Sequence, residues 1–518
     1  MGEMYLEKKV RNSMIGFILI IGVLARIIWI GQVPGGIHQD EAYSGYEAYS
    51  LLKTGMDSHG YVNPVYFISW GHGMNALYAY LTIPFIAIGG LSVYTIRIPQ
   101  IILGCLTLPL FYLFVKKIAN ERLAVISMFL LAVNPWHIML CRWGLEANLV
   151  PFFLLLGAYF AVRALQENSK YYIPAFIAFG LSLYCYAIMW VFVPLFLFLL
   201  LVYTVYFKKL KVDRYMVTGI ALLVLLALPL LLFLLINNGY IPEIRTSWIS
   251  IPEMDSIRES EVSIRNLKEN LKSLLYVLIW QKDDMLHNSP VVGIYYYCSI
   301  PFILAGGVMS VVHLCKHIYQ KIVGIQDVVC LWFLTACLVG CMISNVNVNR
   351  INCIHLPMIF FSAYGIELFL RKIKGNANKI AVVIITGIYV CSFIVFGLDY
   401  YSEKNTDFYY GYEDALTYAE SITDGKIGTV MIRYPLILMH TKMLSKEYLQ
   451  QMDGAKNFDT KGIFGRYVTE PSSEDMETDM VYVVSKSFEK QYLTEGFKTE
   501  FDNGSYVVIV GNNIIKKE

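Results

Sequence analysis

Apolar segments of membrane-spanning length recur between residues 14 and 398, and this repetition constrains the fold more than any single motif does. A helix needs about 20 mostly apolar residues to cross a bilayer. Only 16% of the 518 residues are charged, whereas soluble domains carry about 25%. The sequence therefore predicts a mainly α-helical, polytopic membrane protein. The apolar windows are roughly 14–30, 76–92, 98–115, 122–139, 147–164, 172–188, 190–207, 215–236, 291–312, 328–343, 353–370 and 380–398.

Charge and cysteine usage exclude other classes of protein. A net charge of +2 gives no general attraction for nucleic acid, so no nucleic-acid partner is expected. The ten cysteines lie almost entirely in apolar segments and lack metal-ligand spacing, which indicates small core residues.

The distribution of basic residues decides how many windows cross the membrane. Cytoplasmic loops carry an excess of Lys and Arg. If window 76–92 does not cross, every basic cluster of the first 380 residues falls on one side, and if it crosses, the bias reverses. We therefore expect about eleven transmembrane helices in the cell membrane, a cytoplasmic N-terminus, and window 76–92 at the outer interface or re-entering.

This topology divides the chain into a transmembrane module and a tail. It also collects the long polar loops on the extracytoplasmic face. The tail has a soluble composition, with a helix-like run YGYEDALTYAESI, strand-like runs IGTVMI and MVYVV, and a strand pair turning at Asp502, Asn503 and Gly504. It predicts a small extracytoplasmic α/β domain. The expected parts are the module 1–398, its outer loops 31–96 and 237–290, and the tail domain 399–518.

An acidic pair, Asp40 and Glu41, follows the first window at the membrane surface. A carboxylate at such a low-dielectric boundary suits a general base, because partial desolvation raises its pKa. The alternative is structural, with Asp40 as the N-cap of a helix from Glu41 to Leu52. The two interpretations are compatible.

The same loop contains further polar residues, and we expect them to line the cavity and shape an acceptor groove. Asp57, His59 and His72 make a divalent metal site conceivable, since carboxylates and imidazoles bind such ions, although their spacing matches no metal motif. Whether a metal or another cofactor takes part is left open. These residues are His38, Asp57, His59 and His72.

Arg142 and Glu146 lie four residues apart at an outer membrane boundary. On one helix they would face the same way and could simply pair. Functionally, Arg142 would bind a phosphate through its forked guanidinium while Glu146 orients it.

Arg350 is the single cation in the Asn-rich run SNVNVNRINCIHLP, just before another window. Polar groups beside a membrane helix are costly to insert, so they indicate a site, with a snorkelling Arg as the alternative. Gln281 and Asp283 of the second outer loop and His355 are expected to line the same cavity, although a solvated loop explains the first two equally well.

A carboxylate with arginines at headgroup depth suits transfer from a lipid phosphate donor. A polyprenyl phosphate leaves as a stable anion, so one base and a phosphate clamp are enough, in contrast to the two carboxylates of glycoside hydrolysis. The arginines would stabilise the charge that develops on the phosphate.

The runs HQDEAYSGYEAYSLLKTGMDSHG, IRIPQIILGCLTLPLFYLFVKKI, NPWHIMLCRWGLEANLVPF and RINCIHLP resemble the C-type (GT-C) membrane glycosyltransferases. The group most similar is that of the protein O-mannosyltransferases and lipid A aminoarabinose transferases. The resemblance covers about the first 165 residues well and extends more loosely to about 370. It implies inverting transfer from a polyprenyl-phosphate sugar, with Asp40 at the position of the base, Arg142 lining the outer cavity, and juxtamembrane helices in the first loop.

The expected function is therefore a glycosyltransferase that moves a sugar from a polyprenyl-phosphate donor to a cell-envelope acceptor. The acceptor is left open among a lipid, a glycan and a protein, and the tail does not match the β-trefoil insertion of eukaryotic mannosyltransferases. A transporter or flippase of lipid-linked saccharides, and a non-catalytic envelope assembly protein, are the alternatives. Inverted repeats and midplane charges, which are typical of transporters, are not visible in the sequence.

Overall fold

The structure is a computed structural model that describes residues 2–69, 73–254, 266–282, 290–402, 409–452 and 462–514. The chain forms two compact units, neither of which is continuous in sequence. Unit 1 comprises Met1–Ile30, Gln100–Leu231 and Arg258–Lys404, and unit 2 comprises Gly31–Pro99, Leu232–Ile257 and Asn405–Glu518. The division of the chain after residue 398 stays a prediction.

Seven helices are long and apolar enough to cross a membrane, or eight if a bent helix pair counts as one span, among the described residues. This confirms a mainly α-helical, polytopic membrane protein. The seven are α1 (Gly2–Ile27), α4 (Val93–Ile118), α7 (Val150–Gln166), which follows the short helix η1 (Glu146–Leu149), α9 (Met189–Tyr206), α10 (Arg214–Asn237), α12 (Ile300–Gln320), which follows η7 (Tyr297–Ser299), and α15 (Asn376–Tyr400).

The other expected spans also contain helices, but shorter or more charged ones. α8 (Tyr172–Ser182) has 11 residues and α13 (Asp327–Met342) has 16. α14 (His355–Lys372) is long enough, but Glu367, Arg371 and Lys372 make it too charged to count as an apolar span. These three helices account for the difference between eight and the expected eleven. Residues 76–92 hold α3 (Leu77–Gly89), whose 13 residues extend about 20 Å, less than a bilayer core of about 30 Å.

A proline breaks one expected span into two helices. α5 (Glu121–Ala132) and α6 (Pro135–Cys141) meet at an angle of 60°. Pro135 has no backbone N–H to continue the α5 ladder and is well suited to begin a new helix. The side chain of Asn134 caps α6 by accepting a hydrogen bond of 3.1 Å from the backbone N–H of His137. The break sets the direction of α6, which ends directly before Arg142.

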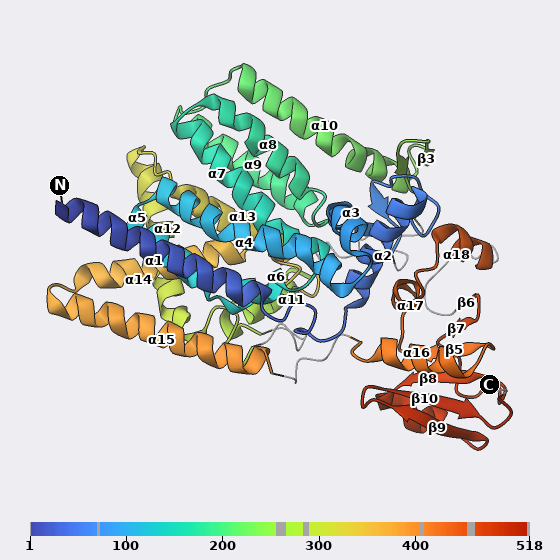
Figure 1. The fold of residues 1–518 in the computed structure, drawn as a ribbon. Helices are drawn as coiled ribbons and strands as arrows, with labels where there is room; N and C mark the ends of the chain where they lie inside the picture. Colours follow the sequence, from blue (N-terminus) through green and yellow to red (C-terminus); the bar gives the residue numbers. More distant parts are fainter. Residues whose placement is uncertain are drawn as a thin grey trace. The chain divides into compact units, whose positions relative to one another are not determined.

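Within unit 1 the long helices run roughly parallel to one another (Figure 1). α12 and α14 approach most closely at two glycines. A Cβ atom at Gly306 would lie 2.0 Å from the carbonyl oxygen of Phe361, and one at Gly365 would lie 2.0 Å from that of Phe302. Small residues at such crossings let membrane helices pack backbone to backbone. The remaining elements of unit 1 are η2 (Ser169–Tyr171), α11 (Leu267–Leu275) and η5 (Tyr276–Trp280).

Unit 2 joins residues from the loops 31–96 and 237–290 to the C-terminal region. The loops contribute α2 (Gln39–Thr54), α3 and two short hairpins, β1 (Tyr66–Phe67) with β2 (Met74–Asn75) and β3 (Ile244–Arg245) with β4 (Ser250–Ile251). The C-terminal helices are α16 (Tyr412–Ile422), α17 (Tyr434–Thr441), α18 (Ser445–Gln451), η8 (Lys486–Phe488) and α19 (Glu489–Tyr492).

The C-terminal region contains a six-stranded mixed sheet in the order β6-β7-β5-β8-β10-β9. β5 is parallel to β7 and β8, while β8, β10 and β9 are antiparallel neighbours. Its core includes Tyr482, Val484, Val507 and Ile509. The helix, the strands and the turn expected in the tail are all confirmed. The strands are β5 (Ile427–Val430), β6 (Gly462–Phe464), β7 (Tyr467–Thr469), β8 (Val481–Ser485), β9 (Phe497–Asp502) and β10 (Tyr506–Gly511).

Candidate functional site

The first turn of α2 carries the acidic pair in two different environments. His38, rather than Asp40, is the N-cap residue, because its Nδ1 accepts a hydrogen bond of 3.2 Å from the backbone N–H of Asp40. Glu41 completes a capping box, because its carboxylate accepts a hydrogen bond of 3.1 Å from the backbone N–H of His38. The interpretation of Asp40 as the N-cap is therefore wrong. A histidine ring nitrogen takes the role that a Ser, Thr or Asp oxygen usually takes.

Glu41 is completely buried in an ion pair with Arg97. The guanidinium donates hydrogen bonds of 2.9 and 3.0 Å to the two carboxylate oxygens, and it also donates to the carbonyls of Pro34 and Gly36. Such a bidentate pair is geometrically specific, and removal of one partner from a buried pair costs about 3–5 kcal/mol. Glu41 therefore fixes α2 against the chain before it and the start of α4.

Asp40 is left accessible by the same arrangement. Its side chain is 32% exposed, and one carboxylate oxygen lies 3.7 Å from Nδ1 of His38. The first turn of a helix favours negative charge. Asp40 is thus an accessible carboxylate on a rigidly held backbone, with an imidazole beside it.

The C-terminal region contributes side chains to this end of α2. The Tyr409 hydroxyl donates a hydrogen bond of 3.0 Å to the side chain of Gln39. Burial raises the pKa of that hydroxyl. The nearby charge of Arg433 lowers this pKa, whereas the charge of Asp40 raises it. Tyr409 and Arg433 therefore belong to the surroundings of Asp40.

The same region packs along the rest of α2 through α17. Tyr43 contacts the ring of Tyr434 edge-on, and the Tyr46 hydroxyl donates a hydrogen bond of 2.7 Å to the carbonyl of Met443. At the last turn, the hydroxyls of Thr54 and Ser445 lie 2.9 Å apart. The helix that carries Asp40 is therefore fixed from its first turn to its last by residues 409–445.

A second acidic pair, Glu47 and Asp57, lies in the interior of unit 2. Glu47 accepts hydrogen bonds from the backbone N–H and hydroxyl of Ser58, and one oxygen of Asp57 accepts from the N–H groups of His59 and Tyr61 at 2.9 and 2.8 Å. The other Asp57 oxygen has no hydrogen-bond partner among the described residues. Burial raises the pKa of both carboxyls, and their mutual repulsion adds to that of Glu47. The pair favours holding a proton.

The loops 31–96 and 237–290 are connected through Tyr61. Its hydroxyl donates a hydrogen bond of 2.6 Å to the carboxylate of Glu243. Glu243 also forms an ion pair of 2.7 Å with Arg245, and the Arg245 guanidinium stacks over the Tyr61 ring. Burial lowers the pKa of neighbouring His59 to about 3, so its imidazole is neutral at physiological pH. Asp57 and His59 thus shape the interior of the loop that follows α2.

In unit 1, Arg142 lies beside a second buried arginine. The guanidinium of Arg26 donates to the carbonyls of Gly22, Leu131 and Ala132 and contacts Nδ1 of His137. Arg142 donates a hydrogen bond of 3.0 Å to the carbonyl of Arg26, and its guanidinium lies 5.0 Å from the centre of the Tyr401 ring. Both side chains are fully buried. Arg142 ends α6 whereas Glu146 begins η1, so no single helix carries both, contrary to the spacing argument.

The Asn-rich segment and its neighbours form a connected cluster in unit 1. Asn352 accepts a hydrogen bond from the Trp136 indole and donates to Ala147 and Asn148, directly after Glu146. Arg350 is half-buried and donates to the carbonyl of Ser344.

His355 joins the same cluster at the start of α14. It contacts the carbonyl of Val348, the hydroxyl of Tyr295 and the ring of Trp136. The side chain of Gln281 in turn accepts a hydrogen bond of 2.8 Å from the backbone N–H of Tyr295. Gln281 and His355 are both fully buried, so these bonds hold the cluster together.

The expected site residues therefore divide between the two units. Unit 2 holds His38, Asp40, Glu41, Asp57 and His59, and unit 1 holds Arg142, Glu146, Gln281, Arg350 and His355. His72 and Asp283 lie outside the described residues.

A bound metal was also conceivable from the sequence. In the described part of the chain, no three His, Cys, Asp or Glu side chains are grouped so that they could hold a metal ion. His72, one of the candidate ligands, lies outside these residues, so the metal site stays a prediction, and the reaction proposed for this chain uses no metal.

Sequence reasoning missed Arg97, Tyr409 and Arg433. Arg97 stands at the edge of an apolar window, and a charge in that position needs a partner, which was a usable signal. Tyr409 and Arg433 lie in a tail of ordinary soluble composition, and no local pattern marks them.

Comparisons with known proteins agree with this architecture. Residues 76–233 match the family model of dolichyl-phosphate-mannose-protein mannosyltransferase. No curated protein sequence matches the chain. The structure is similar to that of ArnT from Cupriavidus metallidurans in the apo state, with a TM-score of 0.57, 10% identity, and coverage of 97% of this chain and 98% of that one.

Two further structures are similar to the same extent. ArnT bound to undecaprenyl phosphate gives a TM-score of 0.53 at 10% identity, with coverage of 97% and 98% of the two chains. The oligosaccharyltransferase of Archaeoglobus fulgidus gives 0.57 at 12% identity, covering 96% of this chain and 73% of that one. The chain therefore has the GT-C fold of membrane glycosyltransferases.

Proposed function

We propose that the chain is an inverting glycosyltransferase that uses a polyprenyl-phosphate sugar and has Asp40 as its base. The observation that carries this proposal is the contrast within one helical turn, where Glu41 is saturated by Arg97 while Asp40 remains accessible. The fold, and the undecaprenyl phosphate bound by one similar structure, support a lipid-phosphate donor. The sugar and the acceptor remain unspecified.

In the proposed reaction, the acceptor hydroxyl attacks the anomeric carbon on the face opposite the phosphate. A carboxylate oxygen of Asp40 takes the hydroxyl proton as the new carbon–oxygen bond forms. The bond between the anomeric carbon and the phosphate oxygen breaks, and its electron pair leaves on the polyprenyl phosphate. The anomeric configuration is inverted. One base is enough because the leaving group needs no proton.

Positive charge is needed where the phosphate leaves, and we assign this role to Arg350 and Arg142. Arg350 is half-buried and carries a forked guanidinium that matches phosphate oxygens, so it suits direct contact with the departing phosphate. Arg142 is fully buried against a backbone carbonyl and Tyr401, so it suits a fixed electrostatic role. The tail and outer loops belong on the extracytoplasmic face in this proposal, since the basic clusters mark the cytoplasmic side.

The test uses the purified chain in nanodiscs with radiolabelled undecaprenyl-phosphate sugars and an envelope acceptor fraction. We expect the donor to be consumed, free undecaprenyl phosphate to appear in equal amount, and the product to have inverted anomeric configuration. If intact donor instead crosses liposome membranes that contain the protein and no lipid phosphate is released, the chain is a transporter and the proposal is wrong.

A further inference from the structure

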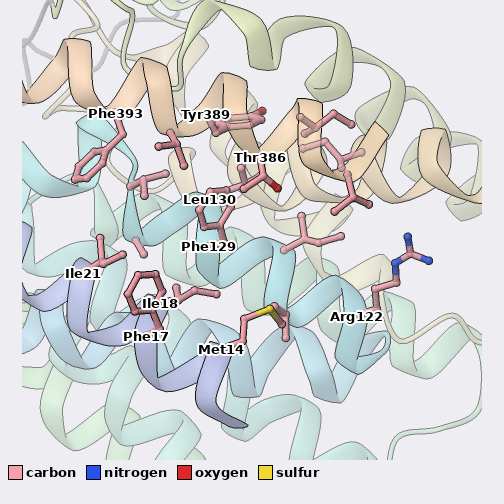
Figure 2. Close-up of a pocket in the computed structure, with 18 of the residues that line it drawn as sticks. Met14, Phe17, Ile18, Ile21, Arg122, Phe129, Leu130, Thr386, Tyr389 and Phe393 are labelled. Atoms are coloured by element: carbon pink, nitrogen blue, oxygen red, sulfur yellow. The ribbon is translucent and has the colours of Figure 1, made fainter. Parts of the chain in front are cut away.

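Unit 1 contains a groove of about 870 Å³ that the proposed reaction does not use. Its walls come from α1, α5, α14 and α15, and its lining is almost entirely apolar (Figure 2). Leu130 and Tyr389 form a buried floor, whereas Phe17 and Ile394 at the rim are 63% and 54% exposed. The groove is therefore open along one side, on a helix surface made for contact with lipid.

The length of the groove matches one leaflet of a bilayer. Its lining runs along α1 from Arg11 to Ile21 and along α15 from Val382 to Ile394. At 1.5 Å per residue these stretches are about 15 and 18 Å long. A hydrocarbon core of about 30 Å is twice that length. A partner transmembrane helix or a long polyprenyl chain would extend well beyond the groove, whereas the acyl chains of one phospholipid would fill it.

One end of the groove is positively charged. Arg122 stands at this end, exposed, and none of the described residues pairs with it (Figure 2). Arg11 is close by, 3.4 Å from Glu121, and that single carboxylate is shared with Lys116 at 2.8 Å. Arg11, Lys116 and Arg122 thus outnumber the single carboxylate of Glu121, and the nearby Glu367 has its own cation in Arg371 at 2.8 Å. This end therefore keeps a net positive charge for a headgroup phosphate. Basic pockets between transmembrane helices are known to bind anionic lipid headgroups.

This cationic end lies away from the buried arginines of the candidate site. Arg26 is 15 residues along α1 from Arg11, about 22 Å by helical rise. A lipid with its phosphate near Arg122 therefore has its headgroup in the leaflet opposite to the Arg26 and Arg142 end of the bundle. A donor that delivers its sugar at that end would place its phosphate there and not at Arg122.

We propose that this groove is a binding site for one anionic glycerophospholipid, with its phosphate at Arg122 and Arg11 and its acyl chains against α1, α5 and α15. The bound lipid would cover the apolar gap between α1 and α15 and so support α1, which carries Arg26, and α15, which ends directly before Tyr401. The site is separate from the donor site of the proposed reaction.

The test is native mass spectrometry of the detergent-purified chain with equal amounts of phosphatidylglycerol and phosphatidylcholine that carry the same acyl chains. We expect one phosphatidylglycerol to be retained preferentially. Arg122→Gln should lower this preference about fivefold, the contribution of one basic residue. Arg214→Gln, which removes an exposed arginine at the start of α10, should leave it unchanged. Val390→Trp, which fills the groove from α15, should reduce retention of both lipids.

Three results would overturn the proposal. One is equal retention of the two lipids by the unsubstituted chain. Another is displacement of phosphatidylglycerol by undecaprenyl phosphate together with a raised donor KM in Arg122→Gln, which would make the groove the donor site. The third is a dimer without bound lipid that Val390→Trp dissociates, which would show that a second copy covers the groove.

Discussion

The two acidic sites of unit 2 differ in access and in hydrogen bonding, although both lie on α2 or directly after it. Asp40 is one-third exposed and, among the described residues, lies 3.7 Å from His38. Glu47 and Asp57 are fully buried, are bonded to backbone N–H groups, and have raised pKa values. A base for an incoming substrate must be reachable, which describes the first site. The second site has the properties of an interior, proton-holding support.

Glu41 shows what separates the two kinds of site. It is adjacent to Asp40 in sequence, yet Arg97 and the capping box occupy both of its oxygens. The ion pair orients the turn and leaves Asp40 to the solvent. The accessibility of Asp40 therefore depends on the complete burial of Glu41, and single substitutions can test this dependence.

The largest effect is expected from Arg97→Ala. This substitution leaves Glu41 buried without its cation, which should destabilise the protein by about 3–5 kcal/mol. Thermal unfolding in detergent measures the loss, and Lys490→Ala on the exposed surface of α19 is the control. An unchanged melting temperature would show that the pair does not hold the turn.

Arg350→Ala should lower kcat/KM for the lipid donor by about a hundredfold, as expected when one positioned donor to a developing anion is lost. Stability should change less than in Arg97→Ala, because the Arg350 side chain is only half-buried. Initial rates at varied donor concentration measure the effect. If kcat/KM stays the same, positive charge at the phosphate comes from elsewhere.

The buried pair predicts a pH dependence of stability. Because the folded-state pKa values of Glu47 and Asp57 lie above the ordinary carboxyl value of about 4, the folded protein holds protons that the unfolded chain releases. The free energy of unfolding should therefore fall as pH rises above 4 toward neutrality, by up to about 1.4 kcal/mol per pH unit for each proton held.

Asp57→Asn should flatten this dependence. The amide keeps an oxygen for the N–H groups of His59 and Tyr61 and replaces the carboxylate oxygen that lacks a partner with a donor. Transfer activity at neutral pH should be close to that of the unsubstituted chain. An undiminished slope would show that the pair does not hold the proton, and a complete loss of transfer would give Asp57 a chemical role.

The smallest effect is expected from Tyr409→Phe. It removes the hydrogen bond to Gln39, a contribution of about 1 kcal/mol. If the tail region positions the first turn of α2, kcat should fall a few-fold while donor KM stays constant. Tyr410→Phe, at the exposed neighbouring residue, is the matched control. Equal rates for both variants would limit the role of the tail to packing against α2.

Much of the fold follows from local sequence patterns. The lengths of the apolar segments predicted where the membrane helices lie. The strand-like runs on either side of the Asp-Asn-Gly turn predicted β9 and β10. Three of the expected spans contain helices shorter or more charged than a typical span, because window averages do not show where a helix ends. α8, for example, ends at Ser182, inside its apolar window.

The candidate site was predictable only where its residues are close in sequence. Asp40 and Glu41 stand out together, but their different roles depend on Arg97, 56 residues away. Tyr409 reaches Gln39 across 370 residues. The imidazole cap of His38 was missed since Asp, Asn, Ser and Thr dominate this position. Pairings of this kind are set by tertiary packing, which a single sequence does not reveal.

The most direct measurement of the central claim is single-turnover sugar transfer by Asp40→Asn. The amide keeps the shape of the side chain and cannot accept the acceptor's proton. We predict a rate lower by about 10²–10⁴-fold, the usual contribution of a general base, with donor binding and melting temperature unchanged. Asp475→Asn, at an exposed carboxylate of the C-terminal region, should transfer at the full rate. Transfer by Asp40→Asn within a few-fold of the unsubstituted chain would contradict the assignment of Asp40 as the base.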